Sequence, residues 1–285
     1  MPRAHLIVIF AAALAIPLLG VAQENDPAKR SSNASSAQTG TPTPAKSCDA
    51  RSLLLNFPIY RDGEPTREVP VWRLGESTPY FFAAGMTIDA DGSPNAYNPE
   101  NTGLDDLANA GQPGHWDGVL QDADGNPLVQ GADDPFPGYY ISCTSLADRT
   151  KRPLDPTRFV DASKIPYIVL PREVAFESGT RLGDFAVVMN LRSGAWSYAI
   201  FADVGTFGEG SIALANNLGI WSDAREGGRR GGILYLVFPG TGDGQPRSID
   251  EINEIAGKSF QDWGGAERLN SCAASETPAA WPWYR

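Results

Sequence analysis

The chain has 285 residues and a formal net charge of −11 at pH 7, and its length allows one large domain or two small ones. The acidic balance disfavours nucleic acid and anionic lipid as partners and favours a cationic one. Two histidines and three cysteines argue against a Ser-His-Asp triad, a multi-histidine metal centre and a zinc site, which leaves carboxylates as the groups for proton transfer.

The first segment has the features of a secretory signal peptide. Basic Arg3 precedes an apolar run from Leu6 to Ala22, and small residues at the end of this run predict cleavage after Ala22. A membrane anchor is the alternative, but the run is short for a spanning helix and contains Pro17. We therefore expect a signal peptide over residues 1–22, export to the periplasm or the extracellular space, and no stable membrane insertion after its removal.

Residues 23–47 consist largely of Ser, Ala, Thr, Pro, Asn and Gln, with hardly an apolar side chain. Such a segment cannot bury enough apolar surface to offset the entropy lost on folding, so we expect a disordered linker. A single catalytic domain is then predicted over residues 48–285.

Short apolar runs rich in aromatic and branched residues recur through this domain and are bounded by Gly, Pro, Asp and Asn. They predict strands at Leu53–Phe57, Val69–Trp72, Tyr80–Ile88, Tyr139–Cys143, Tyr167–Leu170, Phe185–Met189, Ala195–Ala202 and Ile233–Phe238. Helices are expected over Ser211–Leu218 and Ile249–Trp263, and Ser248 with Glu251 forms a capping-box pattern before the second. Many strands with few helices predict a mainly β (α+β) fold, a compact β-barrel-like domain, with the double-psi type as one candidate, and two or so packed helices.

The three cysteines lie in a chain that we expect to reach an oxidising compartment. We predict a disulfide between Cys48 and Cys272, which would tie the start of the fold to its tail and contribute about 4 kcal/mol in the chain-entropy model. Cys143 belongs to an alternating segment and is expected to be a small buried side chain rather than a reactive thiol.

Two carboxylates, Asp203 and Glu209, follow the apolar run that ends at Ala202 and lie six residues apart among glycines. Hydrolysis of a glycosidic bond needs such a pair, one protonated carboxyl for the leaving oxygen and one ionised carboxylate to activate water or attack the sugar. The alternative is structural, with Asp203 ending a strand and Glu209 favouring a helix N-terminus.

Several segments carry a resemblance when they are taken in order: Met86–Gly92, Tyr139–Leu146, Ile165–Leu170, Phe185–Val188, Ala202–Asp203 and Gly208–Leu214. Together they resemble the chitosanases of glycoside hydrolase family 75, over about residues 80–240. The resemblance implies a secreted endo-acting enzyme that hydrolyses the β-1,4 glucosaminyl bonds of chitosan with inversion, and Asp203 and Glu209 match its catalytic pair. The short spacing between the two acids suggests a bacterial branch, and Cys143 stands where a small hydroxyl residue is more usual.

A cationic polymer such as chitosan would be concentrated by a cleft lined with aspartates. We expect Asp89, Asp91, Asp133 and Asp134 to contribute to such a lining, although both pairs also fit simple turns. Sugar rings pack on aromatic side chains, and Trp116 and Tyr139 are candidates for that contact.

We assign Glu209 as the general acid and Asp203 as the base, with the order open because a helix N-terminus would favour ionised Glu209. No cofactor and no metal are expected, and the enzyme is expected to be a monomer whose partner is chitosan or a related cationic polysaccharide. The alternatives are a hydrolase of another cell-wall glycan, a non-catalytic secreted carbohydrate-binding protein and an interaction module of the envelope.

Overall fold

The computed structural model describes residue 48 and residues 51–61, 64–75 and 78–276. The predicted signal peptide and linker lie outside these residues. Within them, no helix combines the length and the hydropathy that a bilayer crossing needs.

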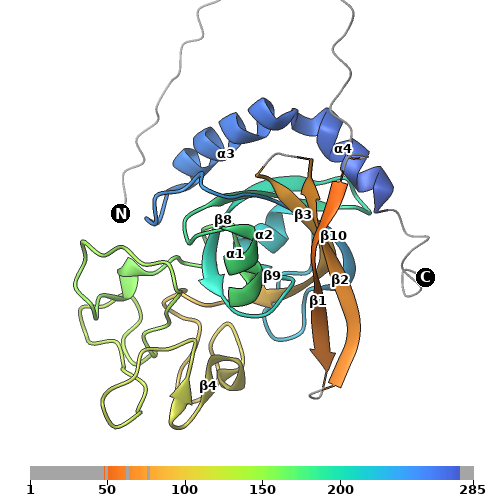
Figure 1. Ribbon diagram of the computed structural model, residues 1–285. Helices are drawn as coiled ribbons and strands as arrows, with labels where there is room; N and C mark the ends of the chain where they lie inside the picture. Colours follow the sequence, from red (N-terminus) through yellow and green to blue (C-terminus); the bar gives the residue numbers. More distant parts are fainter. Residues whose placement is uncertain (1–47, 49–50, 62–63, 76–77, 277–285) are drawn as a thin grey trace, which may run out of the picture. The chain divides into compact units, whose positions relative to one another are not determined.

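Ten strands and four α-helices make up the regular structure of the described chain (Figure 1). The strands are β1 (Arg51–Arg61), β2 (Glu64–Leu74), β3 (Tyr80–Asp89), β4 (Gly111–Gln112), β5 (His115–Trp116), β6 (Tyr167–Leu170), β7 (Phe185–Asn190), β8 (Trp196–Val204), β9 (Glu209–Ser211) and β10 (Arg229–Phe238). The helices are α1 (Arg172–Ser178), α2 (Ile212–Asn217), α3 (Ile249–Trp263) and α4 (Gly265–Ser275), with 3₁₀ turns at Leu107–Ala110 and Pro156–Arg158.

Six strands close into a barrel in the order β3-β10-β7-β8-β6-β9, and the ring is completed by the pairing of β9 with β3. The β6–β8 and β3–β9 pairs are parallel, and the others in the ring are antiparallel. The β1–β2 hairpin extends the sheet from β3, while β4 and β5 form a separate small ribbon. The predicted mainly β fold with a barrel and packed helices is thus confirmed, and the double-psi type stays a prediction.

Alternation along the strands separates the barrel interior from its outer face. On β3, Phe82 and Met86 belong to the cluster that fills the barrel, whereas Phe81 and Ala83 pack with Phe260 and its neighbours from the covering helices. Helix α3 lies across β7 and β8, and Figure 1 shows it continuing into α4 along the same side. Residues of β3 with odd numbers therefore face outward. The polar residues at the end of this strand, Thr87 and Asp89, have odd numbers and lie on that outer face.

The predicted helix Ile249–Trp263 is confirmed with its capping box. Ser248 Oγ accepts a hydrogen bond from the backbone N–H of Glu251, and the Glu251 side chain accepts one from the Ser248 N–H. Helix α2 is slightly shorter than the predicted Ser211–Leu218, and Ser211 is its N-cap residue.

Two further helices were not expected, and one expected strand is wrong. Helix α1 is only seven residues long, and the buried face of α4 includes Arg268, which stacks on Trp263 and interrupts the apolar pattern. The segment Tyr139–Cys143 is not a strand, since only isolated bridges occur there, at Tyr140 and Ser142. Its backbone is instead hydrogen-bonded residue by residue to the irregular segment before it, for example from the Ile141 N–H to the Leu128 carbonyl and from the Cys143 N–H to the Gly118 carbonyl.

A disulfide joins Cys48 to Cys272 of α4, with their Cα atoms 5.0 Å apart. Both cysteines are buried in the cluster that lies between the barrel and the covering helices. The bond therefore fixes the start of the described fold against its last helix.

Candidate active site

Four neighbouring strands carry one row of residues in register on the outer face of the barrel. Asp203 of β8 pairs with Val169 of β6, Val169 pairs with Glu209 of β9, and Glu209 pairs with Thr87 of β3. Residues directly opposite each other on adjacent strands share a face of the sheet. This row places the two predicted catalytic carboxylates on one surface, with Val169 between them.

Asp203 reaches this face through a register shift in the sheet. Strict alternation from Phe201, which points into the barrel, would also turn Asp203 inward. However, Ile168 pairs with Phe201 and the next residue, Val169, pairs with Asp203, so Ala202 is an extra residue on β8. Such irregularities re-aim a side chain, and here the shift leaves Asp203 lining the cleft.

The carboxylate of Asp203 is held by three donors on one oxygen. Its Oδ1 accepts hydrogen bonds from the Ser145 backbone N–H at 2.9 Å, from the Ser145 hydroxyl at 2.5 Å and from the Val204 N–H at 2.8 Å. Burial raises the pKa of Asp203 above its ordinary value, and these donors oppose the rise because they stabilise the charged form. Asp203 is therefore oriented through Oδ1, and Oδ2 accepts no backbone hydrogen bond from the part of the chain that the structure describes.

Glu209 lies in β9 and not at the start of a helix, so that part of the expectation was wrong. Helix α2 begins at Ile212, and its N-cap Ser211 accepts the hydrogen bond from the Leu214 N–H. The first helical turn thus lies beyond Glu209, and the helix dipole, which acts within that turn, has little influence on its charge.

Burial is the main influence on the Glu209 carboxyl. It raises the pKa of Glu209, the nearby charge of Asp203 raises it further, and hydrogen bonding from Thr206 opposes the change. The Thr206 backbone N–H donates to Glu209 Oε2 at 3.0 Å. Gly205 leaves room for this carboxyl, since a Cβ at that position would lie 3.1 Å from Oε2 and 2.9 Å from a methyl group of Val169.

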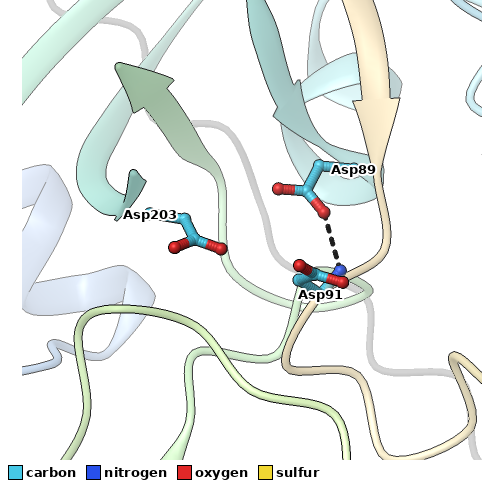
Figure 2. A group of neighbouring side chains, drawn as sticks. All are labelled: Asp89, Asp91 and Asp203. Carbon is cyan, nitrogen blue, oxygen red and sulfur yellow. Dashed lines mark hydrogen bonds between the residues drawn. The ribbon is translucent and has the colours of Figure 1, made fainter. Parts of the chain in front are cut away.

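Asp89 and Asp91 approach Asp203 from the end of β3, and the three side chains point toward one another (Figure 2). One oxygen of each carboxylate lies within 4.8 Å of the others. Asp89 Oδ1 accepts a hydrogen bond from the Asp91 N–H at 2.8 Å, so the predicted turn is present. Both residues also line a cleft on this face, as predicted. Asp91 Oδ1 accepts a hydrogen bond from the Tyr97 hydroxyl at 2.7 Å.

These crowded acids cannot all be ionised without a counter-charge. Burial and the charge of Asp203 raise the pKa of Asp89 to about 8, and burial and the charge of Asp89 raise the pKa of Asp91 as well. Oxygen ligands in this arrangement would suit a hard cation such as Ca²⁺ or Mg²⁺. Protons satisfy the same electrostatic requirement, and the expectation that no metal takes part stays a prediction.

The row of paired residues that contains Asp203 and Glu209, called the acid row below, lies in a cleft together with Asp89 and Asp91. This cleft has a volume of about 690 Å³ and lies between the barrel face and the long irregular segment that follows β3. Its carboxyl side chains are Asp89, Asp91, Asp105, Asp117, Asp203 and Glu209. Among the described lining residues, the only positive charge is Arg172. The cleft is thus strongly acidic.

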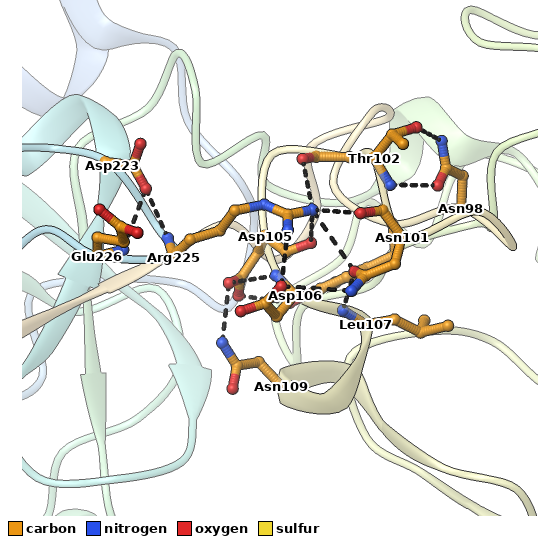
Figure 3. Close-up of polar contacts among 12 residues, drawn as sticks. Asn98, Asn101, Thr102, Asp105, Asp106, Leu107, Asn109, Asp223, Arg225 and Glu226 are labelled. Atoms are coloured by element: carbon orange, nitrogen blue, oxygen red, sulfur yellow. Dashed lines mark hydrogen bonds and ion pairs between the residues drawn. The ribbon is translucent and has the colours of Figure 1, made fainter.

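One wall of the cleft is fixed by Arg225, which lies on the loop before β10 (Figure 3). Its guanidinium pairs with Asp106 at 2.7 Å and donates to the backbone carbonyls of Asn101, Gly103 and Asp105. Asp105, which lines the cleft, is held in turn by its neighbours Asn109 and Asp106. The irregular segment therefore has a defined conformation on the side that faces the acids.

The other predicted lining residues are not brought into this cleft. Asp133 and Asp134 border a second hollow of about 710 Å³, and Asp134 accepts a hydrogen bond from the Gly131 N–H, as the turn interpretation predicts. Trp116 is half-buried, and its indole N–H donates to the Gly125 carbonyl. Tyr139 packs edge-on against Phe136. None of these four lines the cleft that holds the row with Asp203 and Glu209, and their contact with substrate stays a prediction.

Several residues of the site escaped the sequence analysis. Ser145 lies in one of the segments that carry the family resemblance, but its contact with Asp203 spans 58 residues of chain. Tyr97, Asp105 and Asp117 belong to the long polar stretch, where no periodic pattern marks the inward positions. The only available signal was the length of that stretch, because long structured loops in a domain are often functional.

Cys143 is a free, half-buried cysteine that also lines the cleft. Burial and the neighbouring carboxylates, first Asp91 and then Asp203, raise the pKa of its thiol to about 12. The thiol is therefore protonated at ordinary pH, in agreement with the expectation that it is not a reactive group.

The arrangement provides two carboxyls on one face of the cleft, both with a pKa raised by burial, and one of them, Asp203, held by three hydrogen bonds. A family model described as fungal chitosanase of glycosyl hydrolase group 75 matches residues 86–263, more than half of the chain and all of the acid row. A search of curated proteins found no match.

Proposed function

Because the chain belongs to glycosyl hydrolase group 75, and is therefore a glycoside hydrolase, we propose that it is a secreted endo-chitosanase that cleaves β-1,4 glucosaminyl bonds with inversion. The observation that carries this proposal is the row on the barrel face, where Asp203 and Glu209 flank Val169 in an acidic cleft. Export and the bacterial branch stay predictions from the sequence.

Glu209 is the general acid in this proposal. Its pKa is raised by burial and by the charge of Asp203, and among the described residues only Thr206 donates a hydrogen bond to it. A carboxyl that keeps its proton in mild acid can donate it to the glycosidic oxygen as the bond to the leaving sugar breaks.

Asp203 is the general base. Three donors on Oδ1 favour its ionised form, and they fix the carboxylate so that its other oxygen can accept a proton from the attacking water. The water attacks the anomeric carbon from the face opposite to the leaving group, so the configuration at that carbon inverts.

The charge of the cleft supports a cationic substrate. Chitosan carries protonated amines in mild acid, and six carboxyl side chains border the space next to the acid row. Attraction of this kind raises the local concentration of the polymer and weakens as salt is added.

The test measures reducing ends released from highly deacetylated chitosan in mild acid by the mature protein and three variants. Asp203→Asn and Glu209→Gln should each lower kcat by about 10²–10⁴-fold, since each removes a proton-transfer group. Asp133→Asn is the control, because it removes an acid outside the cleft and should leave kcat unchanged. Thermal unfolding confirms that each variant is folded.

Turnover by both folded variants at the wild-type rate would overturn the catalytic pair. A wild-type protein that degrades purified cell wall but not chitosan would show that the substrate is another glycan. Binding of chitosan without release of reducing ends would indicate a carbohydrate-binding protein.

A further inference from the structure

Arg172 is an unexpected residue in a cleft that attracts a polycation. It occupies the first position of α1, its side chain is exposed, and it borders the same cavity as the six carboxyl groups. Among the described residues, no carboxylate lies within ion-pair distance of its guanidinium. The positive charge is therefore not neutralised by the acids around it.

The strand directions place Arg172 and the aspartate pair on opposite sides of the acid row. Strand β3 runs parallel to β9, and β6 runs antiparallel to β9, so β3 and β6 cross the row in opposite directions. Beyond the row, β3 leads to Asp89 and Asp91, whereas β6 leads through Leu170 and Pro171 to Arg172. The cleft is thus acidic on one side of the catalytic pair and carries a positive charge on the other.

A sugar chain bound across the row would place different units on these two sides. A glucosamine unit carries a positive ammonium group at C2, which carboxyl groups attract and a guanidinium repels. An N-acetylglucosamine unit has no charge there, and its amide carbonyl can accept a hydrogen bond from a guanidinium N–H. The two sides of the cleft therefore favour different units.

We propose that Arg172 is a specificity-determining residue, which selects an uncharged N-acetylated unit on its side of the scissile bond while the Asp89–Asp91 side selects a free amine. This inference rests on the proposed function. These two sides make the enzyme selective for the order of units in a partially acetylated chain. Of the two new ends that each cleavage creates, one is enriched in N-acetylglucosamine and the other in glucosamine.

The experiment digests partially N-acetylated chitosan with the wild type and with Arg172→Gln and Arg172→Glu, and identifies the unit at each new reducing and non-reducing end by mass spectrometry. In the wild type, one of the two new ends should be enriched in N-acetylglucosamine. Removal of a single exposed charge should reduce that enrichment about fivefold, and its reversal should turn the preference toward glucosamine. The other new end should keep its composition.

Arg192→Glu is the matched control. Arg192 lies in the turn between β7 and β8, outside the cleft, and its substitution changes the net charge by the same amount as Arg172→Glu. It should leave the composition of both ends as in the wild type. On fully deacetylated chitosan, Arg172→Glu should raise kcat/KM, again by about fivefold, whereas Arg192→Glu should not.

The inference is overturned if both Arg172 variants hydrolyse the polymer with the wild-type composition at both new ends, or if Arg192→Glu shifts the composition as much as Arg172→Glu does. These outcomes leave the proposed function intact, because the wild type still cleaves chitosan. A wild type that releases no reducing ends from either polymer overturns the proposed function and this inference with it.

Discussion

Asp203 and Glu209 pair with the same residue, Val169, from opposite edges of β6. Adjacent strands lie about 4.8 Å apart, so roughly 9.6 Å separates the backbones that carry the two acids. An inverting enzyme requires a separation of about 6.5–9.5 Å between the carboxyl groups themselves, so that a water molecule fits beside the sugar, and this backbone spacing allows it.

The first prediction concerns the anomeric form of the product. Hydrolysis of the β-linked polymer should give α-anomers first, because water attacks the side opposite to the leaving sugar. Proton NMR during the first minutes of a digest, before mutarotation equalises the anomers, measures this directly. Initial appearance of β-anomers would mean that one carboxylate acts as a nucleophile.

The second prediction concerns Ser145, which we regard as a positioning residue for the base. Ser145→Ala removes the hydroxyl that donates to Asp203 Oδ1 and should lower kcat about tenfold, since a hydrogen bond to a charged group contributes roughly 1.5–3 kcal/mol. The lost donor also raises the pKa of Asp203, so the acidic limb of the pH–kcat profile should move to higher pH.

Ser145→Thr is the matched control for this change, because it keeps the hydroxyl and Ser145 is exposed enough to accept a methyl group. It should restore most of the activity and the wild-type profile. An alanine variant with lower kcat but an unshifted acidic limb would contradict the assigned role.

The third prediction concerns pH and stability. The pKa of Asp89 is raised to about 8 in the folded protein, from an ordinary value of 3.8. At Asp89 the folded state therefore binds more protons than the unfolded state between these values. The stability that this residue contributes is fully present below about pH 4 and is lost as the pH rises toward 8. The melting temperature of the wild type should fall over that range.

Asp89→Asn should flatten this dependence, because the amide is neutral at every pH. Scanning calorimetry from pH 4 to pH 8 measures the difference, with roughly 2–4 °C expected for each kcal/mol that the substitution relieves. Asp133→Asn, at an acid outside the cluster, should keep the wild-type slope. An equal slope in all three proteins would show that Asp89 is ionised throughout.

The fourth prediction concerns the cleft wall. Arg225→Met keeps an unbranched stem but removes the guanidinium, and with it the contacts with Asp106 and with three backbone carbonyls. The wall segment should become less ordered, so KM for chitosan should rise severalfold with a smaller change in kcat. Hydrogen exchange should increase at residues 101–106 and stay unchanged in the barrel strands, and a loss confined to kcat would contradict this role.

Local patterns were sufficient to predict much of the barrel and one long helix. The apolar run Tyr80–Ile88 and the capping box at Ser248 depend on neighbouring residues, so the sequence shows them directly. That Asp203 and Glu209 lie on one surface could be predicted in the same way, because they are close in the chain and stand among glycines.

The surroundings of that pair depend on contacts between distant segments. The outward direction of Asp203 requires the extra residue Ala202, which becomes visible only when β8 is paired with β6. Ser145 reaches Asp203 across the fold, and Arg225 binds a segment that precedes it by more than a hundred residues. Composition and periodicity do not indicate which distant segments come into contact, so the roles of Ser145 and Arg225 could not be predicted from them.

The closure of the barrel has a consequence for the order of folding events. The ring is complete only when β9, a strand of three residues, joins β3, and these two strands are far apart in the chain. Contacts between such distant segments form late, because the intervening chain must first lose its entropy. The same pairing aligns Glu209 with Thr87, so recovery of hydrolytic activity during refolding should report the last step of assembly rather than the collapse of the core.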